Sequence, residues 1–217
     1  MNRQTIITHA LRQIGDTSLT IQAKEWLDDI LLEMETVGYF WFLFDNTQTI
    51  ATSNNTDAYP LPSNYSKGLS IYSSEPRCLI QVPYSQIEEM RAVFAEEGNP
   101  RFFAVRGHIL EVYPKPVTGS LPFLNLRYFK EITLPTDDTT DLEDLVGIRP
   151  KWHSYLIDGV VWKGFQYIDD NRQDQARLKW ENDLLFMIKD NEDYVTTQEA
   201  KLDKSSLTAR IGSQEVK

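Results

Sequence analysis

Two stretches decide the fold of this chain: Tyr59-Pro60-Leu61-Pro62-Ser63-Asn64-Tyr65 and Arg106-Gly107-His108-Ile109-Leu110-Glu111-Val112-Tyr113-Pro114-Lys115-Pro116. In each, residues that favour β-structure run into a proline, which cannot donate to a ladder and ends the strand that it enters. Sequence with helical periodicity lies before and after the pair. The two stretches therefore predict a strand-rich insertion within a helical protein.

Apolar residues at helical spacing predict two helices before the insertion, which end at Gly15 and Gly38, and two more after Pro150 and Asn171. The segment 150–168 is apolar around most of its circumference. A helix of this kind is central in a bundle or clamped between subunits. We therefore expect subunit packing on this helix, with these candidate residues: Trp152, Tyr155, Trp162 and Phe165.

The expected fold class is α+β. A helical bundle formed by the N- and C-terminal helices carries an inserted antiparallel β-domain and an extended C-terminal tail. The expected parts are residues 1–39 (bundle helices), 40–135 (insertion), 136–195 (linker and bundle helices) and 196–217 (tail). The tail has few large apolar residues and cannot build a core of its own.

Within the insertion, the aromatic run from Phe40 to Phe44 predicts a strand because its β propensity is high. Ser85 and Glu88 form a capping box, which predicts a short helix. Gly107 predicts a hairpin turn at positive φ. The connections are short, so the sequence predicts antiparallel pairing throughout. Glu111 is expected to be a solvated residue on a strand.

Composition narrows the possible functions. The formal net charge of −10 argues against tight wrapping of nucleic acid, whose phosphates bind Lys and Arg, but it is compatible with DNA sliding past the protein. Cys78 is the only cysteine, so no intrachain disulfide is possible and a reducing, cytosolic site of folding is favoured. The sequence shows no signal peptide and no apolar run long enough to cross a membrane, so we expect no membrane association.

Residues for catalysis, cofactor binding and metal binding are not found. His9, His108 and His153 lie far apart, without a zinc-binding motif near them. No phosphate-binding loop, dinucleotide fingerprint or nucleophile elbow occurs. The acidic run 136–144 lacks the spacing of a calcium loop, so we expect a solvated linker at a helix N-terminus. His153, beside Trp152, is expected to make a satisfied polar contact.

An ordered set of motifs resembles the head-to-tail adaptor (connector) proteins of short-tailed bacteriophages. The resemblance covers roughly residues 5–190. In chain order, its motifs are the N-terminal helix pair with Trp26 and Leu27, Trp41-Phe42-Leu43-Phe44, the two proline-ended stretches, Leu126-Arg127-Tyr128-Phe129, the acidic run and the helix from Trp152.

The resemblance implies a virion structural protein, assembled in the host cytoplasm, that forms a dodecameric ring below the portal protein. It implies that double-stranded DNA passes through the ring without specific binding. It also implies attachment of a tail nozzle protein and tail fibres, and a C-terminal extension that docks on the portal. The expected anchors of this extension are Leu202, Leu207 and Ile211.

Two other functions stay open at this stage. The insertion could be a tail-associated module that binds carbohydrate or a fibre protein through exposed aromatic residues such as Tyr72, Tyr84 or Phe103. Exposure of these rings would support that function, and burial of all three would argue against it. The chain could also be a wall-degrading hydrolase carried in a virion, which would need a pocket with two converging carboxylates.

Overall fold

The computed structural model describes the backbone of residues 1–73, 78–94, 96–117 and 123–212, and the side chains of that part up to Asp193, except Ser73. Helices and strands both occur, which confirms the α+β class. The chain divides into two compact units. The helical unit combines Met1–Phe42 with Ile132–Lys217, and the β-unit is Leu43–Glu131.

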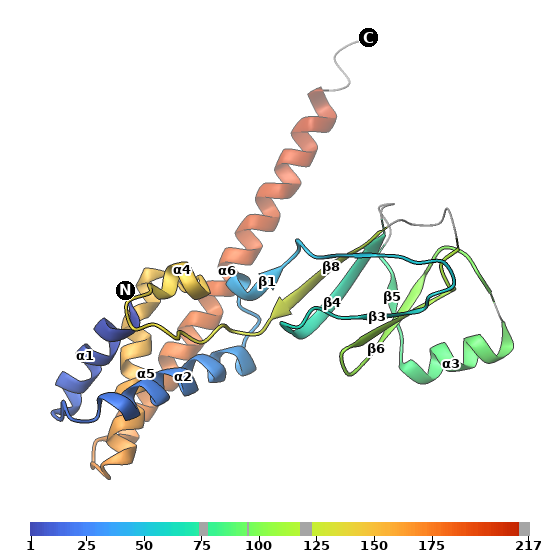
Figure 1. Ribbon diagram of the computed structural model, residues 1–217. Helices are drawn as coiled ribbons and strands as arrows, with labels where there is room; N and C mark the ends of the chain where they lie inside the picture. The colour runs from blue at the N-terminus through green and yellow to red at the C-terminus, as the bar shows by residue number, and fades with distance from the viewer. Residues whose placement is uncertain (74–77, 95, 118–122, 213–217) are drawn as a thin grey trace. The chain divides into compact units, whose positions relative to one another are not determined.

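The helical unit contains α1 (Arg3–Ile14), α2 (Thr20–Val37), α4 (Leu142–Val146), η2 (Pro150–Trp152), α5 (His153–Tyr167) and α6 (Gln173–Gly212) (Figure 1). The side chain of Asn2 caps α1 by accepting from the Thr5 amide at 2.9 Å. Gly15 ends α1 with a φ of 88°, as predicted for a left-handed C-terminal stop. The acidic segment supplies Asp141 as the N-cap of α4.

Helix α5 lies at the centre of this unit, since it contacts α1, α2 and α6. Two glycines allow the close approach. A Cβ atom on Gly164 would lie 2.9 Å from Cγ1 of Ile14, and one on Gly159 would lie 3.0 Å from both Ile30 and Trp180. These contacts agree with a central position of α5, which is one of the two positions that the sequence predicted, and leave the contact with another subunit untested.

The β-unit contains two four-stranded sheets. In the first, β8 (Phe123–Lys130) pairs on one side with β1 (Phe44–Asp45) and β2 (Thr49–Ala51), and on the other with β4 (Tyr65–Ser73). The second has the order β3 (Ala58–Pro60), β7 (Ile109–Tyr113), β6 (Phe102–Arg106), β5 (Ile80–Gln81). Residues of both sheets share one core, which includes Ile71, Phe103, Val112, Leu124 and Leu126.

Strands β5 and β6 pair in parallel, so the prediction of antiparallel pairing throughout is wrong for this pair. The connection between them contains α3 (Tyr84–Val93), which contacts β6, and a helix of this kind is the usual crossover between parallel strands (Figure 1). The first sheet is antiparallel, and Gly107 turns between β6 and β7 with a φ of 60°, as expected.

Two other local predictions are corrected. The aromatic run forms the 3₁₀ turn η1 (Trp41–Leu43) before the short strand β1, because Phe40 and Phe42 pack against Trp152 in the helical unit. Helix α3 begins at Tyr84 with Pro83 as N-cap and no side-chain cap, so Ser85 lies inside the helix and forms no capping box.

The extended conformation expected for residues 196–217 is not found up to Gly212, and the last five residues of that range lie outside the described part of the chain. Helix α6 continues without interruption from Gln173 to Gly212. No helix in the described part of the chain is both long and apolar enough to cross a membrane.

Candidate interaction surfaces

An ionic network connects α3 to the second sheet of the β-unit. Arg91 on α3 places one guanidinium nitrogen 2.5 Å from Glu111 and the other 3.1 Å from Asp57. Arg106 lies 3.6 Å from the second oxygen of Glu111. Glu111 is buried, so the expectation of a solvated strand residue is wrong. The two arginines compensate the buried carboxylate, and the network fixes α3 on β6 and β7.

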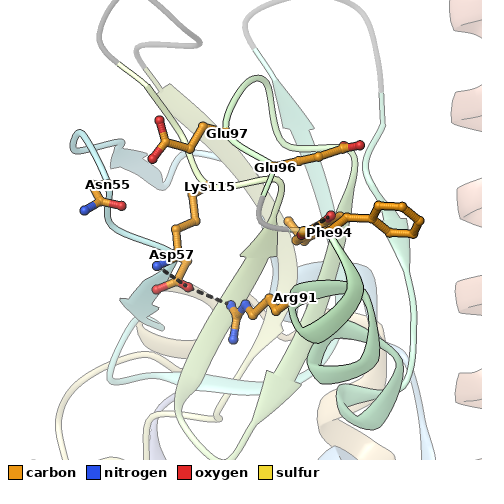
Figure 2. A pocket seen from close by; sticks show the side chains of 8 residues that line it. Asn55, Asp57, Arg91, Phe94, Glu96, Glu97 and Lys115 are labelled. Atoms are coloured by element: carbon orange, nitrogen blue, oxygen red, sulfur yellow. Dashed lines mark hydrogen bonds and ion pairs between the residues drawn. The ribbon is translucent and has the colours of Figure 1, made fainter.

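A pocket of about 250 Å³ opens beside this network. Figure 2 shows Asp57, Arg91 and Lys115 turned toward one another, and Lys115 lies 3.6 Å from Asp57. The remaining lining residues are Asn55, Phe94, Glu96, Glu97 and Tyr113.

In this pocket the positive charges of Arg91 and Lys115 neutralise the negative charge of Asp57. Asp57 and Glu111 both bind the same guanidinium, whereas a glycosidase holds its two carboxyl groups on opposite sides of a substrate. None of the lining residues is a serine, cysteine or histidine. Asp57, the lining carboxylate next to the network, is engaged in ion pairs with Arg91 and Lys115.

The histidines do not assemble a metal site. Among the described residues, no three His, Cys, Asp or Glu side chains come together in an arrangement that could hold a metal ion. His153 is buried at the start of α5, and its desolvation lowers its pKa, which favours the neutral ring. The ring forms a hydrogen bond with the backbone of Ile148, whereas its Nε2 has no hydrogen-bond partner in the described structure. The expected polar contact is therefore present on one side of the ring only.

Two of the four residues predicted for subunit packing lie in the core of the protomer. Trp152 is buried against Phe40 and Phe42 at ring-centroid distances of 5.7 and 6.0 Å, and its Nε1 donates to Asp190 at 3.0 Å. Phe165 is buried beneath the Arg172 guanidinium, which lies 4.1 Å above its ring.

The other two, Tyr155 and Trp162, are half-buried and retain surface that another molecule could cover. The ammonium group of Lys163 lies 5.0 Å from the centre of the Trp162 ring.

Helix α6 is apolar on two opposite faces. Its inner face packs with buried Trp180, Leu184 and Met187. Its outer face exposes Leu178, Leu185 and Phe186 to 60, 63 and 61%. The first two are seven residues apart and therefore lie one above the other. Sequence periodicity recognised the apolar residues of this helix but did not separate them into two faces.

The three residues predicted to anchor the C-terminal tail are part of helix α6: Leu202, Leu207 and Ile211. Their side chains are outside the described residues.

The aromatic residues considered for a carbohydrate or fibre site have different surroundings. Phe103 is buried in the core of the β-unit. Tyr72 and Tyr84 are half-buried, and each ring lies beneath an arginine, Arg127 at 4.2 Å and Arg106 at 4.6 Å. The three rings therefore do not form one exposed aromatic site.

Comparison with known proteins identifies the family. A comparison with curated proteins returns no match. The family model described as SU10 adaptor protein matches residues 1–201, which include both units. The chain therefore belongs to the SU10 adaptor protein family, which confirms the resemblance to phage head-to-tail adaptors.

Proposed function

We propose that this virion structural protein assembles into a ring, with twelve copies as the expected number, below the portal protein. The ring extends the DNA channel and provides the attachment site for the tail nozzle protein and tail fibres. The observation that carries the proposal is the family match over residues 1–201. It covers both compact units and most of α6, so it supports an adaptor role for both parts of the fold.

The outer face of α6 supports assembly. Leu178, Leu185 and Phe186 expose apolar surface on the side opposite the bundle. Apolar surface gathered on one helix face favours contact with another protein. In a ring, each subunit presents two different surfaces to its two neighbours, and we propose that this helix face is part of one of them.

Tyr155 and Trp162 are the proposed subunit-packing residues of α5, because both are half-buried in the single chain. Trp152 and Phe165 are buried by residues of their own protomer. They support the interface indirectly, because their packing holds α5 in place.

The charge of the chain suits a DNA channel. Twelve copies at −10 each carry a formal charge of −120. An acidic wall repels phosphate and avoids the salt-dependent capture that basic grooves produce, so DNA passes without specific binding. A ring whose inner wall holds more Lys and Arg than Asp and Glu would contradict this part of the proposal.

The length of α6 supports docking by the C-terminal segment. Forty residues rise about 60 Å at 1.5 Å per residue, whereas the fifteen of α5 rise about 22 Å. Helix α5 therefore covers only part of α6, and a helix in a protein is stabilised mainly by tertiary packing of one face. We propose that Leu202, Leu207 and Ile211 anchor the remainder on the portal.

The decisive measurement is mass and shape in solution, by mass photometry and electron microscopy, with and without the cognate portal protein. We expect a ring seated on the portal. A chain that neither binds the portal nor forms a ring in its presence would overturn the proposal. Deleting residues 197–217 should leave a folded chain that no longer joins the portal, and normal attachment of the truncated chain would refute the docking role alone.

A further inference from the structure

One face of the first sheet of the β-unit has an unusual composition. Residues of β8 alternate between core and surface, so Phe123, Asn125, Arg127 and Phe129 share the outward side. Every residue paired with these four on β1, β2 and β4 is neutral or basic. The absence of a carboxylate among these described pairs stands out in a chain that has 32 Asp and Glu against 22 Lys and Arg.

We call this surface the aromatic–arginine face and define it by Phe44, Tyr72, Phe123, Arg127 and Phe129. Its ends are apolar: the rings of Phe44 and Phe129 lie 5.5 Å apart at one end, and Phe123, 48% exposed, lies at the other. The Arg127 guanidinium lies 4.2 Å over the Tyr72 ring between them. Within the described part of the chain, Arg127 forms no ion pair with a carboxylate.

This arrangement fits an acidic surface with apolar ends. From Phe123 to Phe129 the strand rises about 20 Å at 3.3 Å per residue. Stacking on Tyr72 holds the guanidinium in place and leaves its N–H edge available for carboxylates. Among the described residues, this side of the sheet has two cations, Arg127 and Lys67, which is paired with Phe129 on β4. Two cations are few for nucleic acid, and the net charge of −10 opposes phosphate, so an acidic protein is the favoured partner.

The outer side of α2 has the complementary pattern. Ile21, Glu25, Asp29 and Leu32 recur at helical spacing and are all exposed, Ile21 to 72% and Leu32 to 45%. This stripe is apolar at both ends and acidic between them. From Ile21 to Leu32, eleven residues later, the helix rises about 16 Å, which is close to the length of the sheet face. Asp29 has a neighbouring cation, since Lys163 lies 3.7 Å away, while Glu25 forms no ion pair in the described structure.

We propose that the aromatic–arginine face of one copy binds the outer stripe of α2 on the next copy, with Arg127 placed against Glu25 and Asp29. The inference rests on the proposed ring and names one of its subunit contacts. The two surfaces differ, so the contact is heterologous, and repetition around an axis closes it into a ring.

Crosslinking tests the contact directly in the full-length chain. In a Cys78→Ser background, one preparation carries Arg127→Cys and another carries Glu25→Cys. They are mixed under assembling conditions, with portal if the ring requires it, and treated with a short thiol–thiol crosslinker. We expect a covalent dimer that contains one chain of each kind. Its absence from rings that still form would overturn the inference and leave the adaptor function standing, whereas failure of the unmodified chain to form any ring would count against both.

Charge reversal provides the second arm. Arg127→Glu should weaken assembly at least tenfold, and adding Glu25→Arg should restore most of it. Arg101→Glu, at an exposed position of the β-unit away from this face, is the matched control and should assemble normally. Circular dichroism checks that each variant folds. Normal assembly of Arg127→Glu would refute the contact. Each variant is also tested for binding of a single-stranded DNA oligonucleotide. If Arg127→Glu loses only this DNA binding and still assembles, the face binds nucleic acid, and the contact is refuted as well.

Discussion

Substitution of Asp183 on α6 tests how the contact between α5 and α6 contributes to the stability of the helical unit. Asp183 is only 8% exposed, and one of its carboxyl oxygens is buried without a hydrogen-bond partner. The Asp183 carboxyl group forms a hydrogen bond with the side chain of Asp158 on α5. A carboxylate oxygen of Asp158 also lies 2.8 Å from the Lys179 ammonium nitrogen. Burial, and then the negative charge of Asp158, raises the pKa of Asp183 from 3.8 to about 6. At neutral pH the α5–α6 contact therefore contains a carboxylate whose ionisation opposes folding.

The sign and size of the effect follow from proton linkage. The folded chain keeps the Asp183 proton up to about pH 6, whereas the unfolded chain releases it near 3.8, so stability falls as pH rises between these values. At about 1.36 kcal/mol per pKa unit, the full shift corresponds to roughly 3 kcal/mol, of which about half develops between pH 5 and 8. Solvent in the pocket that Asp158 lines screens the pair, which leaves about 1 kcal/mol over that range.

The measurement is urea unfolding of Asp183→Asn and of the unmodified chain at several pH values from 5 to 8. This range stays above the sequence pI of about 4.8. The amide cannot ionise and can still donate to Asp158, so its advantage over the unmodified chain should grow by about 1 kcal/mol from pH 5 to 8. A difference in unfolding free energy that is the same at both ends would refute the reasoning.

Asp190, seven residues later on α6, is the matched control with the opposite sign. Burial opposes its ionisation, but Lys151, Arg149 and Trp152 outweigh burial and hold the pKa of Asp190 below its ordinary value. The stabilisation from its charge is complete above about pH 4 and is lost only at lower pH. Asp190→Asn should therefore lose stability by an amount that does not change between pH 5 and 8.

Three further substitutions test the packing. Gly164→Ala should lose about 1–3 kcal/mol in thermal unfolding, despite its better helix propensity, because the new methyl group meets Ile14. Glu111→Gln should lose about 1.5–3 kcal/mol in urea unfolding, because Arg91 loses its charged hydrogen bond to the buried carboxylate and keeps only Asp57 as an ion-pair partner. Asn191→Ala should lose about 2 kcal/mol and speed amide exchange at position 41, because its side chain bridges two backbone groups before η1.

Each of these has a control, on the same helix for Gly164 and Asn191 and, for Glu111 of β7, on the helix that its ion pair holds. Gln166→Ala on α5, Glu89→Gln on α3 and Lys189→Ala on α6 alter exposed side chains, so each should leave stability within about 0.5 kcal/mol. Equal losses in a variant and its control would show that the named contact is not the cause.

Elements whose boundaries are set by local chemistry could be predicted from the sequence. Gly15 and Gly107 need a left-handed backbone, and both take it where expected. The strand before Pro114 has the predicted limits, Ile109–Tyr113. A glycine or a proline restricts the backbone within a few residues of its own position. The turns and strand ends that it sets therefore do not depend on distant contacts.

Predictions failed where distant residues decide the structure. The aromatic run at 40–44 has strand propensity, but Trp152, more than a hundred residues away, holds two of its rings in the helical unit. Glu111 alternates like a surface residue of a strand, yet Arg91 from α3 compensates it in the interior. Arg91 itself carries no local signal, because an arginine on a short amphipathic helix is ordinarily solvated.

The same limit applies more strongly to the surfaces of an adaptor, because an apolar side chain has one sequence signature whether it packs inside its own protomer or against a neighbour. The four residues predicted for subunit packing on α5 follow a single pattern, but two are covered by their own chain and two keep exposed surface. On α6, the apolar residues divide in the same way between an inner and an outer face. Periodicity therefore predicts that a face is covered, and only the protomer's own contacts show which faces remain for a partner. Tyr155, Trp162 and the outer face of α6 meet that criterion, which is why they, and not the most apolar positions of the sequence, are the places to search for the neighbouring subunit.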